Sequence, residues 1–124
     1  MAEHIVQLAN ELGLLGLADR VNAKVVTVAD FDAAVSHIEG ILQRDNARLA
    51  GVTVMAKDKA LWDTDYRPKL QQAFQHQLQA VAEFHAYAKH PAEAQLIQGI
   101  QFLGQANALM QSLEGMPEQV QAAV

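Results

Sequence analysis

The 124-residue chain contains no cysteine. It therefore has no disulfide framework, no thiolate nucleophile and no cysteine-ligated zinc or iron–sulfur centre. Positive charge is also scarce: nine residues are Lys or Arg against 14 Asp or Glu, and the basic residues are scattered along the chain. Because phosphate binding needs clustered positive charge, this balance predicts no nucleic-acid partner.

Targeting and membrane signals are lacking as well. The first residues, Met1-Ala2-Glu3-His4, lack the basic region and apolar core of a secretory signal. The longest uncharged run, residues 94–113, is long enough to span a bilayer, but it carries five glutamines together with Asn107 and Ser112. We therefore expect a cytoplasmic protein without membrane contact, and the length predicts one domain.

Motifs for nucleophilic catalysis and phosphate binding are missing. The two serines, Ser36 and Ser112, lie in neither a nucleophile elbow nor a Ser-x-x-Lys motif. No glycine-rich loop has the spacing that cradles a phosphate. These absences favour a non-enzymatic protein without a cofactor.

The five histidines do not form a recognisable metal motif. Helical metal sites pair His with a carboxylate three or four residues away, because only those positions share a helix face. Within the predicted helices, the pairs two residues apart are His37 with Glu39 and Glu83 with His85, whose side chains point to opposite sides. We therefore predict no metal.

Apolar residues recur at three- and four-residue spacing through most of the chain, which predicts an all-α bundle. Thr27 and Asp30 fit the start of a helix, and His90-Pro91 predicts a turn between two others. Residues 21–28 are predicted to be an extended linker and 62–68 a loop, and the pattern leaves open whether the second helix continues beyond Gly51. We predict a single-domain bundle of four to five helices, the third and fourth forming an antiparallel hairpin, at about 2–15, 28–59, 66–89 and 91–114, with a short helix at 117–123.

The second half of the chain is rich in Ala and Gln and poor in charge. The sequence has 22 Ala and 14 Gln, and 12 of the Gln lie at or after Gln71, whereas only five charged residues follow Leu70. Glutamine both donates and accepts hydrogen bonds and does not repel a like surface, so it suits a symmetric interface. A compositional bias of the genome explains the same counts without any interface.

The predicted helix 91–114 is apolar around most of its circumference. Its firmly polar arc covers only about 60°, whereas a surface helix is normally polar on the whole face opposite a narrow apolar stripe. Such a helix is buried either at the centre of a bundle or between subunits. We take Phe102, Leu109 and Leu113 on this helix as candidate interface residues.

A second candidate interface lies in the predicted loop, which contains Trp62, Tyr66 and Arg67. Trp, Tyr and Arg are the residue types most enriched at interface hot spots. In the alternative interpretation, the two aromatic side chains close the end of the bundle core, since large aromatics are usually buried.

Three polar residues fall on apolar helix faces: Asp45 in the second helix, and Gln77 and His85 in the third. Buried polar groups need partners, so we expect Asp45 to contact His85 or Gln77 across the two helices. Such a pair either fixes the register of the helices or forms an acid/base dyad in a pocket.

The sequence thus favours a non-enzymatic, self-associating helical protein that acts through protein–protein contacts. A structural or adaptor subunit of a larger assembly, viral or bacterial, fits this interpretation. The alternative is a small-molecule-binding or enzymatic bundle with a polar site at Asp45, Gln77 and His85.

Overall fold

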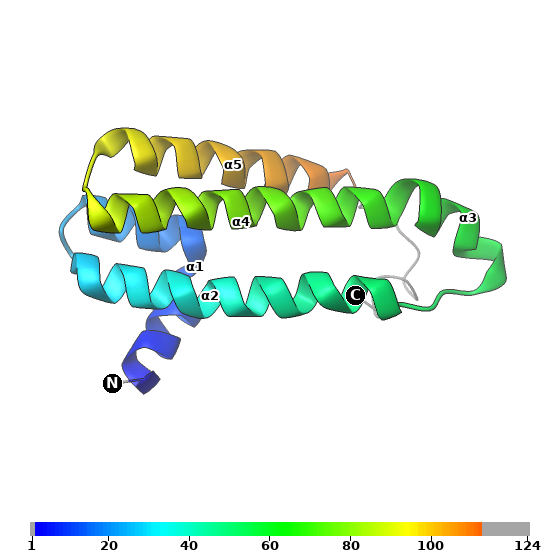
Figure 1. The fold of residues 1–124 in the computed structure, drawn as a ribbon, viewed down its shortest axis with the longest axis horizontal. Helices are drawn as coiled ribbons and strands as arrows, with labels where there is room; N and C mark the ends of the chain where they lie inside the picture. The colour runs from blue at the N-terminus through cyan, green and yellow to red at the C-terminus, as the bar shows by residue number, and fades with distance from the viewer. Residues whose placement is uncertain (1, 113–124) are drawn as a thin grey trace.

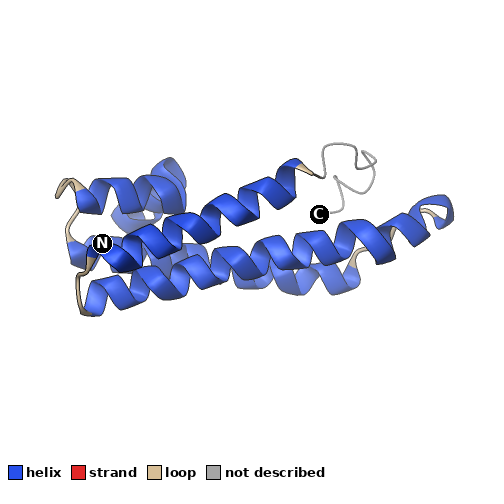
Figure 2. Ribbon diagram, turned by 90° about the horizontal axis from the view of Figure 1, so that it is seen from above, coloured by secondary structure: helices blue, strands red, loops and turns tan. Residues whose placement is uncertain are grey.

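The computed structural model describes residues 2–112, and these form an all-α bundle without strands (Figures 1 and 2). None of the helices in this range is both long and apolar enough to cross a lipid bilayer. The predictions for Leu113 and for helix 117–123 lie outside the described residues. The four long helices are α1 (Ala2–Asn22), α2 (Val28–Arg48), α4 (Arg67–Lys89) and α5 (Glu93–Gln111).

Helix α1 is longer than the predicted 2–15 because a second helical segment follows directly after a kink at Gly13. Gly13 has φ 66° and ψ −177°, a backbone conformation that is essentially restricted to glycine. After this bend the helix resumes and continues to Asn22, so the predicted linker shrinks to residues 23–27. In Figure 1 the N-terminal part of α1 projects past α2, while the part after the bend lies within the bundle.

Helix α2 begins where the sequence predicts. Thr27 has extended backbone angles, and its Oγ1 accepts a hydrogen bond from the backbone N–H of Asp30 at 3.2 Å. The helix does not continue to residue 59. It ends at Arg48 in a 3-10 turn, η1 (Leu49–Gly51), and the chain leaves the turn in extended form at Val52, within the β-branched stretch 52–54.

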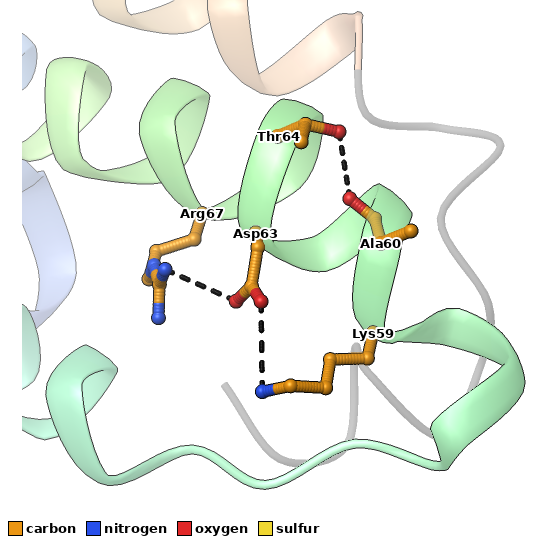
Figure 3. A network of polar contacts seen from close by, with 5 residues as sticks. All are labelled: Lys59, Ala60, Asp63, Thr64 and Arg67. Carbon is orange, nitrogen blue, oxygen red and sulfur yellow. Dashed lines mark hydrogen bonds and ion pairs between the residues drawn. The ribbon is translucent and has the colours of Figure 1, made fainter.

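The prediction of a loop at 62–68 is wrong, because this segment is helical. A 3-10 turn η2 (Ala56–Asp58), a single turn α3 (Lys59–Leu61) and a π-helical turn η3 (Trp62–Tyr66) lead directly into α4. Pro68 lies in the first turn of α4, where no intrahelical N–H is needed. Local contacts hold the turn: Thr64 Oγ1 donates to the carbonyl of Ala60 at 2.6 Å (Figure 3).

The hairpin of α4 and α5 is confirmed, and it forms the largest contact in the bundle. The main core lies between this hairpin, α2 and α1, and it is centred on Phe31 and Phe84, whose rings meet edge to face at 5.6 Å. Gly99 of α5 lets the Phe84 ring approach the α5 backbone: a Cβ at this position would lie under 3.0 Å from three ring carbons.

Helices α2 and α4 run antiparallel, so the start of α2 lies beside the end of α4 (Figure 1). A second, smaller core closes the opposite end of these two helices and consists of Leu49, Trp62 and Leu70. Helix α5 packs chiefly on α4 and contacts α1 only lightly. Within residues 2–112, one long side of α5 therefore has no neighbouring helix along most of its length.

Candidate functional site

An apolar groove lies between α1 and α5. It consists of two adjoining cavities. The first has a volume of about 540 Å³ and lies between the second half of α1 and the start of α5. Its walls are apolar except for Asp19, Asn22 and Glu93, and the apolar lining includes Leu12, Leu15, Leu96, Ile97 and Ile100.

The second cavity has a volume of about 680 Å³ and continues along α5 toward its C-terminal end. Helix α2 contributes Ile38, Ile41 and Leu42 to its floor, and α4 contributes only Gln77. Leu15 and Ile100 line both cavities, so the two form one continuous feature. We call it the α1/α5 groove.

The rim of the α1/α5 groove exposes large apolar side chains. Leu15 is 58% exposed, Ile97 49% and Ile100 39%. Single exposed apolar residues are common on protein surfaces, but a contiguous group around a concave surface is typical of a binding site. Among the described residues, the only ionisable ones that line the groove are Asp19 and Glu93, and both lie in the first cavity.

Of the predicted interface residues of α5, neither Phe102 nor Leu109 lines this groove. Phe102 and Leu109 are half-buried, and Phe102 packs against the main core and stacks on His76 with ring centroids 6.3 Å apart. Leu113 lies outside the described residues. The exposed large apolar side chains of α5 that do line the groove are Ile97 and Ile100.

The second predicted interface, formed by Trp62, Tyr66 and Arg67, lies in a helical segment and not in the predicted surface loop. Trp62 is only 2% exposed and belongs to the smaller core, so it is not available on the surface. Tyr66 packs against the same core. Arg67 is occupied by an ion pair with Asp63 at 3.0 Å, and Asp63 also contacts Lys59 at 3.5 Å (Figure 3). The alternative interpretation of this segment, closure of the bundle end, therefore agrees with the structure.

His85 has two acidic neighbours, and neither is the predicted one. Its Nδ1 lies 2.6 Å from Asp32 Oδ1, and its Nε2 lies 3.5 Å from Glu39 Oε1. Both carboxylates belong to α2, so His85 links α4 to α2 through both ring nitrogens. A shallow cavity next to it is lined by Asp32, Lys89 and short apolar side chains.

The prediction that Asp45 contacts His85 is wrong. Asp45 is partly exposed and pairs with Arg48 of the same helix at 3.6 Å. Gln77 lies in the second cavity of the α1/α5 groove, which neither Asp45 nor His85 lines. The three predicted residues therefore do not converge on one polar site.

Nothing in the described part of the chain gathers metal ligands: residues 2–112 contain no group of three or more His, Cys, Asp or Glu side chains placed to hold an ion. Comparisons with protein-family models, curated proteins and solved structures found no match to this chain. The α1/α5 groove is the candidate site that its geometry supports best.

Sequence reasoning missed the role of Leu15 and did not separate Ile97 and Ile100 from the other apolar residues of α5. The sequence signal was present in the apolar circumference of this helix. The additional information needed was which side of α5 packs on α4. Gly99 supplies it, because the approach of Phe84 to this glycine fixes the rotation of α5.

Proposed function

We propose that this protein is a non-enzymatic, self-associating helical subunit that acts in the cytoplasm through protein–protein contacts. The observation that carries the proposal is the α1/α5 groove, with Leu15, Ile97 and Ile100 exposed along one continuous apolar surface. Exposure of such a surface to water is unfavourable, and its burial by another chain removes that cost.

The charge distribution supports association between copies of the chain. The formal net charge is −5, so two copies repel each other at most points of contact. Helix α5 is an exception, because Glu93 is its only charged residue. Its exposed polar positions are mainly glutamines, which hydrogen-bond to their own kind without repulsion.

The surroundings of His85 support a structural role for this residue. A catalytic imidazole needs one nitrogen directed at a substrate. Here Asp32 and Glu39 lie next to the two ring nitrogens, which suits a polar link between α2 and α4. A register-fixing contact of this kind is consistent with a bundle whose function depends on its outer surface.

The proposal is tested by the molar mass of the protein in solution. We expect size-exclusion chromatography with light scattering to give a multiple of the 13.5 kDa chain mass at the highest concentration. On dilution from about 1 mM to about 1 μM the mass should fall toward 13.5 kDa, in the range typical of a small interface. A chain that remains monomeric throughout contradicts self-association.

A second candidate function is binding of a small apolar molecule in the second cavity. Its volume of about 680 Å³ is in the range of small-molecule sites, and the side-chain amides of Asn10, Gln77 and Asn107 line it. The same measurement separates the two candidates. A strict monomer favours this second function, whereas reversible association favours the first.

A further inference from the structure

The two glycines in the middle of α5 have different surroundings. Gly99 is buried, and the Phe84 ring occupies the space where its Cβ would lie. Gly104 is exposed, and among the described residues no atom beyond its own helix backbone and chain neighbours lies within 4 Å of a Cβ built on it. Glycine is unfavourable inside a helix, and packing among the described residues does not require it at position 104.

Gly104 lies in the exposed apolar stripe of α5. Ile97, Ile100, Gly104 and Ala108 are all exposed and fall within an arc of about 80° around the helix axis. The two isoleucines project on one side of Gly104 along the helix, and the small Ala108 lies on the other. A second helix can therefore approach most closely at Gly104, with its own bulky residues placed over Ala108.

The charges at the N-terminal end of the stripe favour one relative direction for two packed copies of α5. Asp19 and Glu93 both line the first cavity, at the N-terminal end of α5. In a parallel arrangement of two copies, these four carboxylates would lie close together. In an antiparallel arrangement crossing at Gly104, each Glu93 lies about 16 Å from the crossing point on opposite sides, and this separation exceeds the screening length in physiological salt.

We propose that the occupant of the α1/α5 groove is a second copy of this chain, packed with its α5 antiparallel and with the two-fold axis next to Gly104. Ile100 of each copy then lies over Ala108 of the other. This inference rests on the proposed self-association and adds the partner surface, the direction and the crossing point.

The absence of cysteine makes a direct cross-linking test possible, because a single introduced thiol is unique. The Gly104→Cys variant is treated with a mild oxidant, which takes two electrons and two protons from a pair of thiols as the disulfide forms. Its matched control is Gln98→Cys, which is also exposed on α5 but lies about 120° away around the helix. Circular dichroism verifies that both variants remain helical.

We expect Gly104→Cys to form covalent dimers about a hundredfold faster than Gln98→Cys. Two thiols held across an interface meet at an effective concentration near 1 mM, whereas free chains meet at about 10 μM. A mixture of Ile100→Cys and Ala108→Cys chains should form mixed dimers equally well. Ile97→Cys on its own should cross-link slowly, because antiparallel packing separates the two copies of this residue.

Two results would overturn the geometry: cross-linking of Gly104→Cys no faster than of Gln98→Cys, or rapid self-cross-linking of Ile97→Cys, which indicates parallel helices. Light scattering on the same unoxidised samples separates this failure from that of the proposed function. Oligomers without the expected cross-links leave self-association standing and reject the crossing at Gly104. Monomers at all concentrations reject both.

Discussion

Replacement of Gly99 with alanine is expected to lower the free energy of unfolding by about 1 kcal/mol net, because inserting a methyl group into a filled core usually costs about 2 kcal/mol. The new Cβ would lie under 3.0 Å from three carbons of the Phe84 ring. That ring is fully buried and meets Phe31 edge to face, so it has little room to withdraw. The better helix propensity of alanine, worth about 1 kcal/mol, offsets only part of this cost.

Gly104→Ala is the matched control for this prediction. It changes the same residue type in the same helix, but the described residues leave space for the added methyl group. At concentrations where the chain is monomeric, we expect its free energy of unfolding to rise by about 0.5–1 kcal/mol. Urea denaturation followed by circular dichroism measures both variants. An equal gain in stability for the two would show that Phe84 does not pack against Gly99.

Replacement of Ile100 with glutamate is expected to weaken self-association by at least about a hundredfold, which corresponds to about 2.7 kcal/mol. Ile100 lines both cavities of the α1/α5 groove. In a two-fold dimer the substitution buries two unpaired carboxylates and removes two apolar contacts. The fold should remain intact, because this side chain is 39% exposed in the single chain.

Met55→Glu provides the control for Ile100→Glu. Met55 is similarly exposed and lies just before η2, outside the groove. Its substitution adds the same charge to the chain and should leave the association constant nearly unchanged. Sedimentation velocity over a concentration series compares the two variants with the wild type. If both variants associate as the wild type does, the α1/α5 groove is not the contact surface.

Local signals in the sequence were sufficient to predict most of the long helices. Thr27 marks the start of α2 because its side-chain oxygen meets a free N–H of the first turn. Pro91 separates α4 from α5 because the residue before a proline avoids helical angles, and His90 has φ −139° and ψ 86°. Each of these signals acts within a few residues, so it can be recognised in the sequence alone.

The end of α1 and the segment after α3 were not predictable in the same way. A glycine with positive φ usually ends a helix, whereas at Gly13 the chain bends and a second helical segment follows. The turn from Trp62 to Tyr66 contains two aspartates, which resembles a loop, yet it forms a π-helical turn. Trp62 is buried because it packs against Leu49 and Leu70, a contact between segments that the local sequence pattern does not reveal.

The partner of His85 depends on helix register, which a single sequence does not specify. His85 is near the end of α4, and antiparallel packing places that end beside the start of α2. Phe31 and Phe84 fix this alignment, because their rings are in contact in the main core. Asp32 therefore faces His85, while Asp45 lies near the other end of α2. With that one aromatic pair known, Asp32 could have been predicted.

The proposal that a second copy covers the α1/α5 groove is tested most directly by the isoleucine methyl groups. The chain has only five isoleucines, at positions 5, 38, 41, 97 and 100, so selective methyl labelling gives five NMR signals. On raising the protein concentration, we predict shifts of the Ile97 and Ile100 methyl signals, while the buried Ile5, which does not line the groove, stays in place. Unchanged signals of Ile97 and Ile100 in a sample whose mass increases would contradict the account.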